Sequence, residues 1–155
     1  MTEIYTISRE RILDQLEKFI TEQPTYIFVM DLIPTQKESI FDKYEKNDFL
    51  KIHTYSTYLD NIKSFGPTKN ECEITKSVAD AMQVFIFKAM NYNTIAKKTK
   101  KLIVTCEDGR SVSGAIALWA MDWLMDGDEN AFNKLNPDIT PNVPILNNLY
   151  LHPIL

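Results

Sequence analysis

The stretch Val-Thr-Cys-Glu-Asp-Gly-Arg-Ser-Val-Ser-Gly-Ala, residues 104–115, decides the fold of this chain. An apolar strand runs into the thiol of Cys106, and a short turn containing Gly109 follows it. An apolar helix is then expected to open at Ser111 or Ser113. This layout points successive backbone N–H groups and the positive end of a helix dipole at one spot. We therefore expect a loop that binds an oxyanion and lowers the pKa of the cysteine thiol.

The composition predicts one globular domain, residues 1–155, with a core of useful size. Hydrophobic residues make up 45% and aromatic residues 11% of the 155 positions. The net charge is −4, so no basic surface dominates and general nucleic-acid binding is not expected. One basic cluster just before the apolar strand is interpreted as a solvated helix end and less readily as a phosphate-attracting patch. It consists of Lys97, Lys98, Lys100 and Lys101.

The N-terminal segment 1–11 is polar and charged, and no apolar run approaches the ~18 residues of a membrane span. The two cysteines, Cys72 and Cys106, fall in different local settings, which favours reduced thiols over a disulfide framework. These observations predict a cytoplasmic protein without membrane contact. The sequence has no metal-ligand cluster and no Walker-type glycine loop, so no cofactor is expected.

Strand and helix patterns alternate along the chain. Strands are predicted at 26–30, 49–57 and 102–105, and helices at 12–20, 40–44, 74–90, 115–125, 128–135 and 143–150. Ser8 is interpreted as the N-cap of the first helix, and 58–73 as the longest loop. The alternation indicates an α/β fold with a central, mostly parallel sheet flanked by helices. Ligands of such sheets bind at the carboxyl ends of the strands, where Cys106 lies.

The 104–115 loop resembles the signature loop of the cysteine-based protein tyrosine and dual-specificity phosphatases, especially their small bacterial and phage members. That pattern is His-Cys, five residues, then Arg and Ser or Thr. The matching positions are Cys106, Gly109, Ser111, Ser113 and Gly114. The segment Asn-Pro-Asp-Ile-Thr-Pro-Asn at 136–142 also resembles the family's lead into its last helix, so the similarity spans roughly 75–150. It implies a tyrosine-phosphatase-like fold with Cys106 as the nucleophile of a phosphocysteine mechanism.

Two departures from the pattern affect the chemistry. Thr105 replaces the histidine that helps to hold the family's cysteine in its low-pKa state, and Val112 replaces the arginine that binds phosphate bidentately. Valine offers neither donor nor charge. Loss of one preorganised transition-state donor typically costs on the order of 10²–10³ in rate. Glu107 and Asp108 add negative charge that disfavours a dianion. The anion-binding loop that remains consists of Glu107, Asp108, Gly109, Arg110, Ser111, Val112 and Ser113.

The family's general acid is an aspartate upstream of the cysteine. Asp60 is the best positional match and Asp31 the second, although a turn or capping role suits either residue. Arg110 could take over from the missing arginine, but in the matched register its side chain is expected to point away from the cradle. A rhodanese-like loop also combines Cys, Gly and a nearby Arg, which makes sulfurtransferase chemistry a minor alternative.

The sequence thus leads to two main hypotheses. The first is a catalytically impaired phosphatase-fold protein that binds a phosphorylated or anionic ligand at 106–113, or a protein partner. The resemblance to phage members implies one setting for it, a phage-encoded modulator of host signalling or transcription. The alternative is an active phosphatase with Cys106 as nucleophile, Asp60 as acid, and Arg110 or a lysine from 97–101 as anion clamp.

Overall fold

The computed structural model describes residues 2–21, 26–33, 41–42, 52–58, 62–64, 72–74, 76–91 and 100–151. The strands are β1 (Thr2–Ser8), β2 (Tyr26–Ile33), β3 (Ile52–Tyr58), β4 (Ile62–Ser64), β5 (Cys72–Ile74) and β6 (Lys100–Cys106). The helices are α1 (Ile12–Thr21), α2 (Lys76–Asn91), α3 (Val112–Leu124), α4 (Glu129–Leu135) and α5 (Val143–Leu151). No described helix is long and apolar enough to cross a bilayer.

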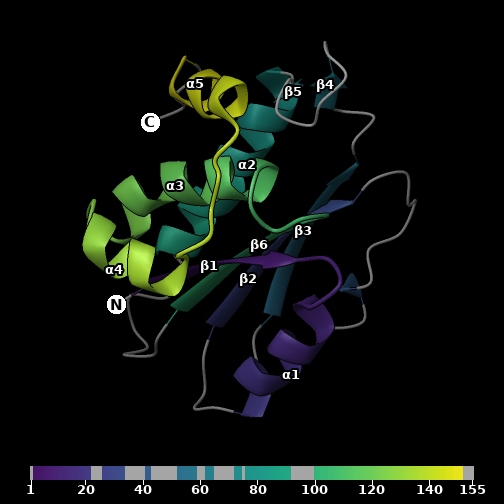
Figure 1. The fold of residues 1–155 in the computed structure, drawn as a ribbon, viewed down its shortest axis with the longest axis vertical. Helices are drawn as coiled ribbons and strands as arrows, with labels where there is room; N and C mark the ends of the chain where they lie inside the picture. Colours follow the sequence, from purple (N-terminus) through teal and green to yellow (C-terminus); the bar gives the residue numbers. More distant parts are fainter. Residues whose placement is uncertain are drawn as a thin grey trace.

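Four strands form an all-parallel sheet in the order β1-β6-β2-β3, with β6 and β2 in the middle (Figure 1). This arrangement confirms the predicted α/β fold with a mostly parallel central sheet. The segment 58–73, expected to be a loop, also contributes to a separate antiparallel pair formed by β4 and β5. These strands are only three residues long, too short for an alternating pattern to stand out in the sequence.

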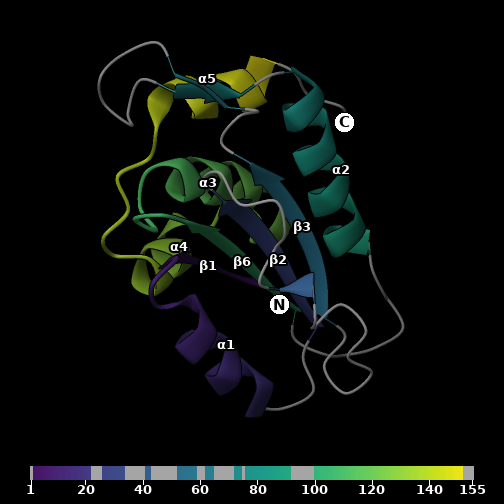
Figure 2. The ribbon, with the colours of Figure 1, turned by 90° about the vertical axis from the view of Figure 1, so that its right-hand side faces the viewer.

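Helices cover both faces of the sheet. Helix α1 lies on one face, while α2, α3, α4 and α5 lie on the other (Figures 1 and 2). The four apolar residues 27–30 of β2 are buried on alternating faces of the sheet: Phe28 and Met30 belong to the larger core under α3, and Ile27 and Val29 pack with α1. A parallel strand buried on both faces has a nearly continuous apolar sequence, which Asp31 interrupts in β2. The strand also runs on to Ile33, beyond its predicted end at residue 30.

Strand β1 was not predicted from the sequence, and the interpretation of Ser8 as a helix N-cap was wrong. Ser8 ends β1 and pairs in register with Cys106 on β6. Ile4 enters the larger core, whereas Tyr5 and Ile7 pack on the α1 side. This alternation of faces is the strand signal that the polar neighbours obscured.

The interpretation of Lys100 and Lys101 as part of a solvated helix end was also wrong. Both residues begin β6, and Lys101 is buried with 5% of its surface exposed. A lysine stem can cover apolar surface along a strand, which is why a charged residue continues this one. Lys97 and Lys98 lie outside the described residues. Strand β6 therefore starts two residues earlier than its apolar run suggests.

Candidate functional site: the Cys106 loop

Strand β6 carries Cys106 to the carboxyl edge of the sheet, and the loop 107–111 leads from there into α3. Neighbouring segments hold the loop by backbone hydrogen bonds. The N–H of Arg9, just after β1, donates to the Cys106 carbonyl oxygen (2.9 Å). On the other side, the Thr140 N–H donates to the Arg110 carbonyl (3.1 Å) and the Asn142 N–H to the Ser111 carbonyl (3.0 Å). The segment resembling the family's lead into its last helix therefore braces the loop.

Gly109 fixes how closely the loop approaches β1. Its φ is +68°, a left-handed conformation that favours glycine. A Cβ atom at this position would lie 2.3 Å from the backbone nitrogen of Ser8 and 2.6 Å from the carbonyl carbon of Ile7. The absence of a side chain at Gly109 thus allows the loop backbone to lie directly against the backbone of β1 at the end of the sheet.

The sulfur of Cys106 is surrounded by polar groups of its own loop and helix. Ser113 Oγ lies 3.1 Å from it, and the Ser113 N–H donates to it over 3.4 Å. On the loop side, the thiol donates to Asp108 Oδ1 over 3.3 Å. A thiol has one proton and a carboxylate only accepts, so the S–H is directed at Asp108 and the Ser113 hydroxyl is left to donate to the sulfur.

The pKa of the Cys106 thiol is raised above its ordinary value, not lowered as the loop pattern predicted. Burial is the main cause, since only 6% of the residue surface is exposed and the thiolate is poorly solvated. The hydrogen bonds from Ser113 lower the pKa, but the charge of Asp108 and its hydrogen bond raise it again. The thiol therefore stays protonated at neutral pH. The sequence could not show how deeply the cysteine is buried.

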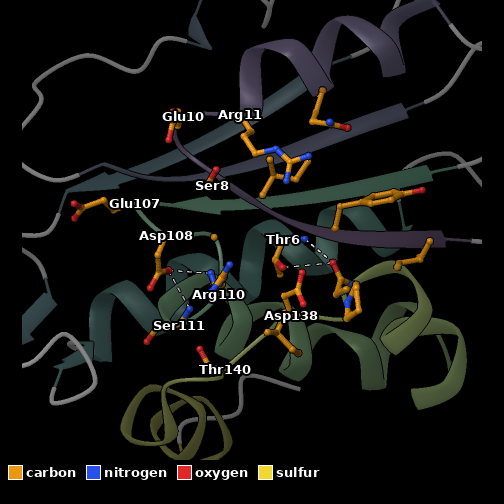
Figure 3. A pocket seen from close by; sticks show the side chains of 18 residues that line it. Thr6, Ser8, Glu10, Arg11, Glu107, Asp108, Arg110, Ser111, Asp138 and Thr140 are labelled. Carbon is orange, nitrogen blue, oxygen red and sulfur yellow. Dashed lines mark hydrogen bonds between the residues drawn. The ribbon is translucent and has the colours of Figure 1, made fainter.

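The carboxylate of Asp108 folds back onto the backbone N–H groups of its own loop. Oδ1 accepts hydrogen bonds from the N–H groups of Arg110 (2.9 Å) and Ser111 (3.2 Å) (Figure 3). It also accepts the hydrogen bond of the Cys106 thiol. An aspartate that bonds the backbone two and three residues ahead of it is a common turn arrangement. Its position two residues after the cysteine was thus a usable signal, whereas Asp108 was interpreted from the sequence as a member of the anion-binding loop that adds negative charge.

The two positions that depart from the phosphatase pattern are both buried. Val112 begins α3, belongs to the larger core and is 7% exposed. Thr105 is fully buried, and its hydroxyl oxygen has no hydrogen-bond partner among the described residues. Ser111 takes the N-cap position of α3 without a capping bond from its side chain. Nothing at these three positions supplies the bidentate cation that the resemblance calls for.

Of the two candidate general acids, only Asp31 lies within the described residues. Asp60 lies outside the described residues. Asp31 is fully buried inside β2 and forms an ion pair with Arg9, so its interpretation as a turn or cap residue was wrong. The Arg9 guanidinium also stacks over the Phe41 ring, 5.7 Å from its centroid. Asp31 is thereby paired with a cation rather than exposed to a leaving group.

A cleft of about 820 Å³ lies on the β1 side of the loop (Figure 3). Its walls are the end of β1 with the start of α1, the loop 107–111, and the segment 135–140. Arg11 and Arg110 both line it and form no ion pair with any described residue. Cys106 is not among the lining residues. In the part of the chain that the structure describes, no group of three or more His, Cys, Asp or Glu residues is placed to hold a metal ion.

Comparison with known proteins gives a match in structure but not in sequence. No family model matches the chain, and no curated protein gives a significant sequence match. The solved structure of Tk-PTP in its active form is similar, with a TM-score of 0.52 and 13% identity over 97% of this chain and 90% of that one. PTPMT1 in complex with PI(5)P is similar as well, with a TM-score of 0.50 and 9% identity over 97% and 89% of the two chains. This chain has a fold like that of the protein tyrosine phosphatases.

Proposed function

We propose that this chain is a phosphatase-fold protein that has lost efficient catalysis and acts by binding. The observation that carries the proposal is the state of Cys106, whose thiol is buried, hydrogen-bonded to a carboxylate and raised in pKa. A phosphocysteine mechanism needs the thiolate, because the thiolate is the competent nucleophile. A loop that keeps the proton on sulfur removes the first step of that mechanism.

Position 112 supports the same proposal. A transferring phosphoryl group needs a preorganised cation against its oxygens, and a bidentate guanidinium meets that need. Val112 instead fills the core between the sheet and α3. Arg110 is exposed and lines the cleft, whose walls do not include Cys106.

The cleft beside the loop is where we place the binding function. Arg11 and Arg110 offer two guanidinium groups to a carboxylate or phosphate, the ligand class expected from the fold. Carboxylates line the cleft too: Glu10, Glu107, Asp108 and Asp138. Four carboxylates against two guanidinium groups suit a protein partner carrying both signs of charge better than a small dianion alone. The proposed ligand is therefore an acidic or phosphorylated group presented by a protein surface.

The biological setting stays a prediction. The resemblance implies a phage-encoded modulator of host signalling or transcription. A free anionic ligand is the other form of the binding proposal. PI(5)P, present in the PTPMT1 structure, is a suitable probe for it, together with phosphotyrosine.

Hydrolysis of p-nitrophenyl phosphate tests the loss of catalysis. The wild-type chain and Cys106→Ser are assayed side by side between pH 5 and 8, and both are expected to give the same background rate. Steady hydrolysis by the wild-type chain that disappears in Cys106→Ser would overturn the proposal in favour of the active phosphatase. Binding of PI(5)P or phosphotyrosine is then compared between the wild-type chain and Arg11→Ala, which is expected to weaken any affinity found.

A further inference from the structure

We propose that Asp108 is a built-in anion: its carboxylate takes the hydrogen-bond donors that an external oxyanion would need, and so keeps the loop closed to phosphate. This inference deepens the proposed function and rests on it, because it names the group that prevents the loop from binding phosphate. It gives Asp108 a role inside the loop in addition to its place in the wall of the cleft.

The donors of the loop support this assignment. A loop of this kind binds an oxyanion through consecutive backbone N–H groups at the start of the helix. Here the N–H groups of Arg110 and Ser111 both point to Asp108 Oδ1, at 2.9 and 3.2 Å. The same oxygen lies 3.3 Å from the Cys106 sulfur. One carboxylate oxygen thus lies within hydrogen-bond distance of the sulfur and of two loop donors, where a phosphoryl oxygen would need to be.

The local electrostatics favour the Asp108 carboxylate at this position over a second anion. Two N–H groups and the positive end of α3 stabilise its negative charge, so a second anion would gain less from the same groups and would be repelled. Among the described residues, Asp108 is also the charged group whose field acts on the thiol. A carboxylate tethered beside its site competes at an effective concentration of about millimolar or more.

The rate at which iodoacetamide alkylates Cys106, measured from pH 6 to 10, tests the proposal. The modified peptide is identified by mass spectrometry so that Cys72 does not contribute to the signal. Four proteins are compared: wild type, Asp108→Ala, Asp108→Asn and the charge-matched control Asp14→Asn, which lies at an exposed position in α1. Each is assayed with and without millimolar tungstate, a tetrahedral oxyanion, and thermal unfolding checks that each is folded.

Asp108→Ala should react faster at pH 7, by roughly three- to fourfold for each unit by which the pKa of Cys106 falls, since a less basic thiolate is also less nucleophilic. Tungstate should slow this reaction because the substitution removes the Asp108 oxygen that accepts from the Arg110 and Ser111 N–H groups in the wild-type chain. Asp108→Asn removes the charge but retains an oxygen acceptor, so it should react faster without being protected. The wild-type chain and Asp14→Asn should react slowly and be unprotected.

Two results would overturn the inference: tungstate protection of the wild-type chain as strong as that of Asp108→Ala, or no faster reaction in either Asp108 variant. The asparagine variant keeps the second criterion usable if the alanine variant does not fold. Failure of the inference is distinct from failure of the proposed function. The proposed function fails on turnover of aryl phosphate by the wild-type chain, whereas this inference fails on alkylation and protection alone.

Discussion

Replacement of Gly109 by alanine tests whether the loop depends on direct backbone contact with β1. The added Cβ would lie 2.3 Å from the Ser8 nitrogen, whereas ordinary contact begins at 3.4 Å, so the two backbones would have to part by about 1.1 Å. The three nearest atoms, Ser8 N, Ser8 Cα and the Ile7 carbonyl carbon, all belong to the backbone and cannot rotate away as a side chain would. Positive φ adds about 1–2 kcal/mol for a residue with a Cβ. A forced fit in a packed region adds about 3 kcal/mol.

Gly127 provides the matched control for this substitution. Its φ is +72°, almost the same as that of Gly109, but among the described residues a Cβ there would have only Asp122 Oδ1 nearby, at 3.9 Å. Gly127→Ala should therefore lose only the 1–2 kcal/mol of backbone strain. Urea unfolding of both variants isolates the effect of the clash, expected to be about 3 kcal/mol in favour of Gly127→Ala. Equal losses in the two variants would refute the close packing of loop and strand.

Three further predictions follow from the residues around the loop. Asn136→Ala should lower the free energy of unfolding by about 2–4 kcal/mol, because the Asn136 carboxamide accepts a hydrogen bond from the Thr6 N–H of β1 and donates one to the Ile4 carbonyl, both at 2.8 Å. A loss of less than about 0.5 kcal/mol in urea unfolding would contradict this prediction. Asp31→Asn should cost about 3 kcal/mol in the same assay, because it leaves the partner guanidinium without its buried counter-charge. The free energy of unfolding should fall above about pH 9, because the raised pKa of Cys106 means that the folded chain binds more protons there than the unfolded chain. Cys106→Ser should flatten this dependence of stability on pH. An unchanged dependence would contradict the raised pKa of Cys106.

The sequence predicted the parts of the fold that repeat a strong pattern. Continuous apolar runs identified the buried strands β2 and β6, and the spacing around Cys106 placed the loop between a strand and a buried helix. Strand β1 escaped because its alternation is split between two cores and interrupted by polar residues. Register, edge position and burial depend on contacts between distant segments, which local patterns do not record.

The sequence predicted where the residues around Cys106 lie, but not the protonation state of its thiol. The thiol, the glycine turn and the hydroxyl of Ser113 next to the sulfur could all be anticipated from spacing. The protonation of the thiol could not, because it depends on the depth of Cys106 and on the direction in which the Asp108 side chain turns. A carboxylate within a loop can face solvent or fold back onto the backbone, and only the structure distinguishes the two.

The central claim, that the phosphatase-like loop holds its cysteine as a thiol, is tested most directly by titration of that residue. The difference in absorbance near 240 nm between the wild-type chain and Cys106→Ser reports thiolate formation at this position alone. We expect no thiolate at pH 7 and a midpoint above that of an ordinary cysteine, because burial and Asp108 both oppose ionisation. A midpoint below pH 7 would contradict the account and indicate an activated nucleophile.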